Sequence, residues 1–139
     1  DLLQQIFYGM LDMTLHDNYE PSESESITDV VIGLQNTITH FPHIDGTYQV
    51  ASFDHLMGYA ASYYGYLWSE VYAADMFSIF EENGIFNTDT GYRFRKSIFE
   101  KGGSDIPMNL VKEFLGREPD KAAFLKKQGV TENSTKKSK

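Results

Sequence analysis

The sequence contains no cysteine, which excludes disulfide bonds and thiol chemistry. No apolar run approaches the roughly 20 residues that a membrane-spanning helix needs, so we expect no membrane partner. Basic residues are few, because 12 Lys and Arg stand against 20 Asp and Glu, and the net charge is −8. Since a nucleic-acid backbone is bound through positive charge, we expect no nucleic-acid partner either.

The start of the chain lacks both a methionine and a signal-like segment. Asp1 lies inside an amphipathic pattern, so we expect the chain to be a piece of a longer polypeptide. With no targeting segment in view, the expected location is the cytoplasm.

Aromatic side chains and helical periodicity are what the sequence does contain. Aromatic residues make up 14% of the 139 residues, a high share for a globular chain. Apolar residues recur at helical spacing along most of the chain. We therefore expect an all-α fold of about six helices, with residues 1–130 forming a single helical unit and residues 131–139 a disordered tail. The expected helices span residues 2–15, 27–38, 59–83, 88–101, 105–115 and 119–128.

Residues that favour helix ends support these boundaries. Ser22–Ser26 offers several N-cap oxygens for the second helix, and Ser104 is expected to cap the short helix that follows it. Asn83-Gly84 is suited to end the central helix. Residues 40–52 are expected to form a loop, in which Tyr48–Val50 is a brief extended segment.

Residues 53–80 hold five tyrosines and the only tryptophan. The first part of this stretch is expected to be a short loop, with His55 near its start and Gly58 at its bend. Three of the tyrosines fall on one face of the helix that follows, because successive residues turn by about 100°. These are Tyr59, Tyr63 and Tyr66.

A tyrosine hydroxyl is a neutral hydrogen-bond donor at neutral pH. In a dry cleft it can stabilise negative charge that develops on a carbonyl oxygen. His55 could do the same, or could bind the backbone of a substrate. The alternative is that Tyr63, Tyr64 and Tyr66 are ordinary packing residues whose oxygens reach water or carbonyl groups.

An ordered series of motifs runs through the chain from residue 53 onward. The run HLMGYAASYYGYLWSE at 55–70 is followed by Tyr92-Arg93, Gly102-Gly103-Ser104 and Phe114-Leu115-Gly116-Arg117. Together these motifs resemble the zinc metallopeptidase family that comprises thimet oligopeptidase, oligopeptidase A and mitochondrial intermediate peptidase. The resemblance covers residues 53–130 well and the first two helices weakly. It implies that the chain is the C-terminal part of such an enzyme.

The resemblance implies a zincin-like, helical metallopeptidase that hydrolyses short peptides in a deep channel between two halves. By the motif match, His55, Tyr63 and Tyr66 are expected to be catalytic, through stabilisation of the tetrahedral intermediate. The residues expected to bind the substrate are Gly58, Tyr59 and Tyr64.

The zinc motif of that family, His-Glu-x-x-His, does not occur in this chain. His40 and His43 form a close pair, but Pro42 prevents a regular helical presentation, and a zinc site needs three or four ligands. We therefore expect no metal ligand here, and zinc to be bound by residues outside this chain, in the upstream half of the same enzyme. The chain alone is predicted to be inactive.

Two functional interpretations follow. The first is the C-terminal part of a zinc-dependent oligopeptidase, with short peptides as substrates and the upstream half of the enzyme as partner. The second is a noncatalytic helical module, derived from that family, which binds a peptide or a partner chain.

Overall fold

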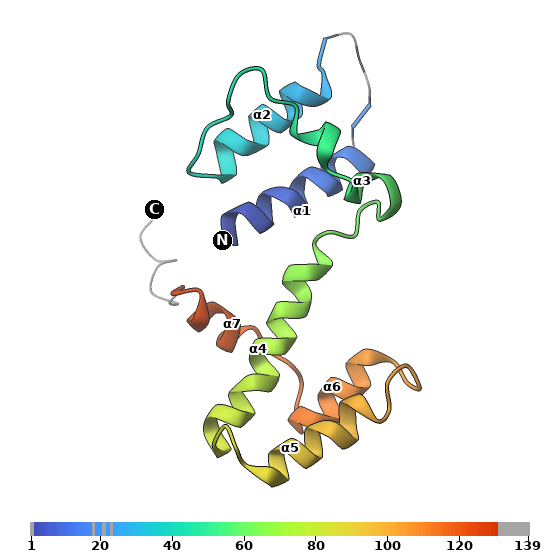
Figure 1. Ribbon diagram of the computed structural model, residues 1–139, viewed down its shortest axis with the longest axis vertical. Helices are drawn as coiled ribbons and strands as arrows, with labels where there is room; N and C mark the ends of the chain where they lie inside the picture. The colour runs from blue at the N-terminus through green and yellow to red at the C-terminus, as the bar shows by residue number, and fades with distance from the viewer. Residues whose placement is uncertain (1, 18, 21, 23, 131–139) are drawn as a thin grey trace. The chain divides into compact units, whose positions relative to one another are not determined.

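The computed structural model describes residues 2–17, 19–20, 22 and 24–130. Every regular element in that part of the chain is helical, which confirms the predicted all-α fold class (Figure 1). The chain divides into two compact units, residues 1–67 and residues 68–139, which we call unit 1 and unit 2. That residues 1–130 act as a single unit stays a prediction, and the predicted disordered tail lies outside the described residues. No helix of the described part is long and apolar enough to cross a membrane.

Unit 1 begins with the two predicted amphipathic helices, α1 (Leu2–Asp17) and α2 (Ile27–Ile38), which lie side by side (Figure 1). Ser26 caps α2 as part of a capping box, because its hydroxyl accepts from the backbone N–H of Asp29. The core of the unit consists of three buried side chains and the partly buried apolar residues packed against them. The three buried side chains are Phe7, Leu11 and Val31.

The segment after α2 contains two short helices, η1 (Gln49–Ser52) and α3 (His55–Gly58). The prediction of an extended segment at Tyr48–Val50 is wrong. The N–H of Ala51 donates to the carbonyl of Tyr48, which closes a 3₁₀ turn, and no strand in the described residues offers a ladder for an extended segment. Val50 and Phe53 instead pack against the core of unit 1.

The long helix α4 (Gly65–Asn83) starts six residues later than the sequence predicts. Ala61 has a positive φ of 54°, which interrupts a right-handed helix. The backbone N–H groups of Ala61 and Tyr63 donate to the side chain of Asp12 instead of to helix carbonyls. The prediction that Tyr59, Tyr63 and Tyr66 share one helical face is therefore wrong. The predicted end is confirmed, because Gly84 follows the helix with a φ of 100°.

Unit 2 comprises the rest of α4 and four further elements. These are α5 (Thr88–Phe94), the π-helical turn η2 (Arg95–Phe99), α6 (Pro107–Leu115) and α7 (Ala122–Lys127). Three phenylalanine rings, Phe80, Phe94 and Phe114, pack against one another with centres 5.1–5.9 Å apart. Ile79 and Leu115 complete the buried core around them.

Two predicted helix starts in unit 2 are wrong. Ser104 does not cap α6, because Ile106 occupies the N-cap position and the Asp105 carboxylate accepts the N–H of Ile106 at 2.6 Å. Pro119 does not open the last helix, which begins at Ala122. In both places an aspartate side chain accepts a backbone N–H where the helix begins: Asp105 from Ile106, and Asp120 from Ala122.

Candidate functional site

One histidine and three tyrosines of unit 1 bring their rings together around the loop that precedes α4. The ring centre of His55 lies 4.9 Å from that of Tyr63, 5.2 Å from Tyr59 and 5.9 Å from Tyr66. We call these four residues the aromatic cluster. Tyr63 and Tyr66 also touch each other edge to face, with ring centres 5.1 Å apart. The loop thus gathers the predicted side chains even though they do not share a helical face.

Tyr63 lies at the inner side of the aromatic cluster. Its hydroxyl donates to Oε1 of Gln5 on α1 at 3.2 Å. Burial raises the pKa of the Tyr63 hydroxyl above its usual value of 10, although the hydrogen bond to Gln5 acts in the opposite direction. The hydroxyl therefore remains protonated at neutral pH, and its hydrogen is donated to Gln5. Tyr66, in contrast, is 58% exposed and presents its ring to solvent.

A carboxylate on α1 holds the loop that carries the aromatic cluster. The side chain of Asp12 is completely buried. Its Oδ1 accepts from the N–H of Ala61 at 3.1 Å, and its Oδ2 accepts from the N–H of Tyr63 at 2.8 Å. Nδ1 of His16 lies 3.0 Å from Oδ1 of Asp12 and 2.8 Å from the carbonyl oxygen of Asp12. Since both of those atoms are acceptors, this nitrogen carries a hydrogen.

The imidazole of His55 has one buried nitrogen without a hydrogen-bond partner, Nδ1. The nearest acceptor is Oδ2 of Asp12 at 4.0 Å. The side chain of His55 is 14% exposed, and its ring contacts both the buried carboxylate's side of the loop and the exposed rings of Tyr59 and Tyr66. The phenols in this arrangement can donate hydrogen bonds to a peptide carbonyl, and the imidazole can donate or accept one, depending on its tautomer.

Comparison with known proteins identifies the family of this chain. The model of peptidase family M3 matches residues 1–130. The chain belongs to peptidase family M3. Among its relatives are the oligopeptidases A of Haemophilus influenzae and Escherichia coli, each 40% identical over 131 residues and 93% of this chain. Saccharolysin of Saccharomyces cerevisiae is 40% identical over 133 residues. This M3 chain spans only 19% of the length of the two oligopeptidases A, and 18% of saccharolysin.

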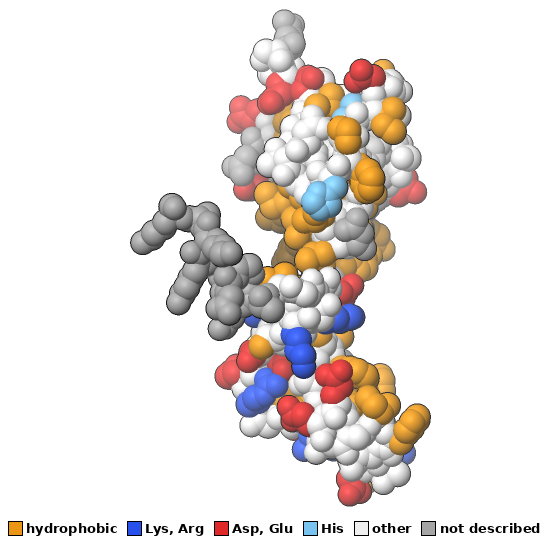
Figure 2. Space-filling model, turned by 90° about the vertical axis from the view of Figure 1, so that its left-hand side faces the viewer, with side chains coloured by type: hydrophobic (Ala, Val, Ile, Leu, Met, Phe, Trp, Pro, Cys, Tyr) orange, Lys and Arg blue, Asp and Glu red, His pale blue; other side chains and the backbone are white. Residues whose placement is uncertain are grey.

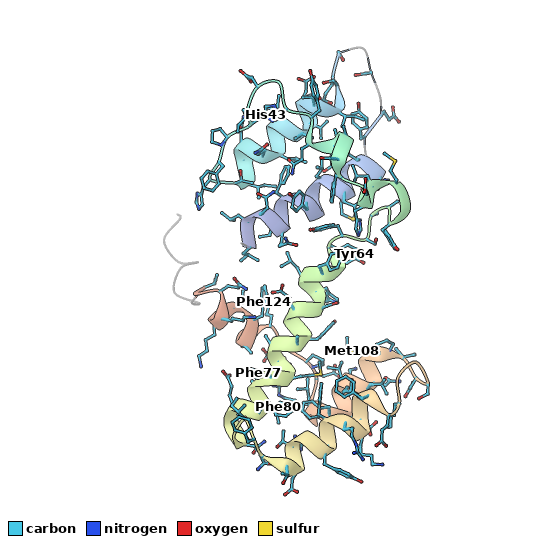
Figure 3. The ribbon with its side chains drawn as sticks, in the orientation of Figure 1. His43, Tyr64, Phe77, Phe80, Met108 and Phe124 are labelled. Carbon is cyan, nitrogen blue, oxygen red and sulfur yellow. The ribbon has the colours of Figure 1, made fainter. Side chains whose placement is uncertain are left out.

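The remaining predicted site residues of the M3 chain lie at the edge of the aromatic cluster. Gly58 is exposed at the end of α3, and its φ is not in the positive range. Tyr64 lies just before the start of α4 and is half-exposed (Figure 3). Its backbone crosses α1 at Gly9, where an added Cβ would meet Tyr64 Cα at 3.6 Å. Tyr64 makes none of the ring contacts that join the four residues of the cluster.

Sequence reasoning missed three residues of α1 that contact the site, Gln5, Asp12 and His16. All three precede the motif by about 40 residues or more, so the local pattern around His55 contains no sign of them. One signal was present: Asp12 occupies a position four residues after Tyr8, on the face of α1 that packs inward. A carboxylate on an inward face needs donors, and here loop amides provide them.

Zinc does not fit the described part of this M3 chain. No three His, Asp or Glu side chains among the described residues are grouped so that they could hold a metal ion. A zinc site needs three or four such ligands.

Proposed function

We propose that this chain is part of a zinc-dependent oligopeptidase and forms the wall of its peptide-binding site. His55, Tyr63 and Tyr66 would contact the reacting peptide bond, and Gly58, Tyr59 and Tyr64 would bind the rest of a short peptide. Zinc would be held by the upstream half of the same enzyme, which is the partner of this chain. The predicted cytoplasmic location is retained as part of the proposal.

The observation that supports this proposal is the packing of His55 against Tyr63 and Tyr66 at the exposed edge of unit 1. As a peptide carbonyl is attacked, negative charge develops on its oxygen. A neutral phenol can donate a hydrogen bond to that oxygen and thereby lower the energy of the transition state. Tyr66 is the better candidate for this role, because its ring is exposed while the Tyr63 hydroxyl already donates to Gln5.

The test is Tyr66→Phe in the enzyme assembled from this chain and its upstream half. The substitution keeps the ring and removes only the hydroxyl. We expect kcat to fall by roughly 10²–10³, the usual loss for one oxyanion donor, with little change in KM. Tyr72→Phe on the same helix is the matched control, because Tyr72 pairs with Trp68 outside the aromatic cluster.

Two other results would reject the catalytic role. A higher KM with unchanged kcat would make Tyr66 a residue that binds substrate without stabilising the transition state. No change in either parameter would leave Tyr66 a packing residue. Tight peptide binding by an assembled protein that hydrolyses nothing would instead support the noncatalytic module.

A further inference from the structure

The completely buried carboxylate of Asp12 lies in a unit that has no permanent positive charge. Residues 1–67 contain nine Asp and Glu but no Lys or Arg. The Lys and Arg side chains visible in Figure 2 all belong to unit 2. A buried carboxylate is strongly destabilised unless donors surround it. For Asp12 those donors are the two loop amides, of Ala61 and Tyr63, and Nδ1 of His16.

Through these hydrogen bonds Asp12 fixes the loop from residue 59 to residue 64. The loop's own backbone bonds are short-range, such as that from the N–H of Ser62 to the carbonyl of Tyr59. Asp12 adds two bonds that cross 49 and 51 residues of sequence. One of them holds Ala61 in a left-handed conformation, which an alanine adopts only when its surroundings require it. The other fixes the backbone of Tyr63, whose ring packs on His55.

Asp12 also faces the imidazole of His55. A nitrogen lone pair directed at a carboxylate oxygen is repelled, whereas an N–H directed at it is attracted. The buried Nδ1, 4.0 Å from Oδ2 of Asp12, therefore favours carrying the hydrogen. The neutral ring then keeps its lone pair on Nε2, which can accept the N–H of a bound peptide.

We propose that Asp12 is a positioning residue: it holds Tyr63 in place and sets the tautomer of His55 for peptide binding and hydrolysis. The expected effect of Asp12 on peptide hydrolysis rests on the proposed function. Its effects on the position of Tyr63 and on the tautomer of His55 do not, because they concern this chain alone. Among the described residues, the other titratable groups in contact with this arrangement are His16 on the carboxylate, the three tyrosines around His55, and Tyr8, whose ring packs on Tyr63.

The first test is nuclear magnetic resonance of the 139-residue chain itself. We expect the ring-carbon and ring-nitrogen shifts of His55 to report the Nδ1–H tautomer. We also expect slow amide exchange at Ala61 and Tyr63, although neither lies in a helix. An Nε2–H tautomer in the unsubstituted chain, or fast exchange at both amides, would overturn the proposal without any variant.

Asp12→Asn then removes the charge and replaces one acceptor oxygen by an N–H₂ group, so that one loop amide loses its partner. We expect that amide to exchange roughly 10- to 100-fold faster, and the Nε2–H form of His55 to gain population. Asp54→Asn is the matched control. Asp54 is next to His55 and exposed, and its side chain makes no cap hydrogen bond. Equal effects of the two substitutions would reject a specific role for Asp12.

The second test uses the enzyme assembled with its upstream half. Asp12→Asn should lower kcat by roughly 10- to 100-fold with little change in KM, and Asp12→Glu should recover part of that loss. If Asp12 acts through Tyr63, the double variant Asp12→Asn/Tyr63→Phe should lose little more than the worse single variant. Additive losses would overturn the proposal. An assembled protein without peptidase activity, but with the expected tautomer and exchange, would reject only the proposed function.

Discussion

The carboxylate of Asp75 on α4 accepts hydrogen bonds from a later segment of unit 2. Arg117 donates to both of its oxygens, at 2.9 and 2.5 Å, and the N–H of Asp120 donates at 2.8 Å. Only 1% of Asp75 is exposed, while the side chain of Arg117 is 43% exposed. Burial by itself raises the pKa of Asp75, but the bonds from Arg117 and Asp120 outweigh it and lower the pKa below its usual 3.8. Asp75 thus links α4 to the segment between α6 and α7.

Asp75→Asn should therefore destabilise unit 2 at neutral pH. We expect a loss of about 1–3 kcal/mol in the free energy of unfolding, at the modest end because solvent screens the exposed Arg117. A carboxylate with a lowered folded-state pKa stabilises the fold above its unfolded pKa, and this stabilisation is lost as pH falls through the folded pKa. The difference between the two proteins should therefore shrink below pH 3.8.

Urea unfolding followed by Trp68 fluorescence, at neutral and at acidic pH, measures this difference. Glu81→Gln on the exposed side of α4 is the control and should change stability by less than about 0.5 kcal/mol. An equal loss for Asp75→Asn at both pH values would mean that the charge of Asp75 contributes nothing.

Sequence alone proposes His55, Tyr63 and Tyr66 as site residues because a motif marks them, and the structure brings their rings together. It could not identify Asp12, because the carboxylate and the amides it binds are 49 and 51 residues apart. Asp75 and Arg117 are separated in the same way, by 42 residues. Such contacts depend on how helices pack, which local periodicity does not specify.

At the scale of elements, the capping box of α2 predicts how much stability is lost when one hydroxyl group is removed. Ser26→Ala removes the acceptor for the N–H of Asp29, which should cost about 1 kcal/mol. Hydrogen exchange of the α2 amides should accelerate accordingly. Ser104→Ala is the matched control, because Ser104 is exposed and does not cap α6. Equal acceleration in α2 and α6 by the respective substitutions would contradict the observed caps.

Helix ends were predictable where the signal is local. The Ser26 cap of α2 and the glycine after α4 stand where the sequence indicates them. The start of α4 was not predictable. A tyrosine-rich run with helical spacing gives no indication that the Asp12 side chain accepts hydrogen bonds from two of its amides. These bonds hold that part of the chain in a loop. The tertiary contact overrides the local preference.

At the scale of the whole molecule, the chain spans about a fifth of its oligopeptidase A relatives. Because the zinc motif of the resembled family is absent from the sequence, the chain alone should bind no zinc and hydrolyse no peptide. Elemental analysis after dialysis and a fluorogenic peptide assay check both points. His43→Ala, which removes one member of the His40 and His43 pair, is the control for adventitious metal. Stoichiometric zinc that survives in this variant would contradict the prediction.

Large apolar side chains are exposed in both units of this chain. Phe41 and Ile44 of unit 1 are 72% and 71% exposed, and Phe86 and Phe99 of unit 2 are 96% and 69% exposed. Isolated surface apolar residues are ordinary, but contiguous patches of several hundred Å² favour association. If an upstream half normally covers such surfaces, the isolated chain should self-associate.

Sedimentation velocity over a range of concentrations tests this expectation. We expect the sedimentation coefficient to rise with concentration and a dye that reports exposed apolar surface to fluoresce. Phe86→Ser with Phe99→Ser should reduce association if unit 2 carries the contact, whereas Phe41→Ser should reduce it if unit 1 does. Added upstream half should suppress association of the unsubstituted chain, because covering the apolar surface removes its cost in water. A chain that stays monomeric at every concentration and binds no dye would contradict the view that another part of the enzyme covers these surfaces.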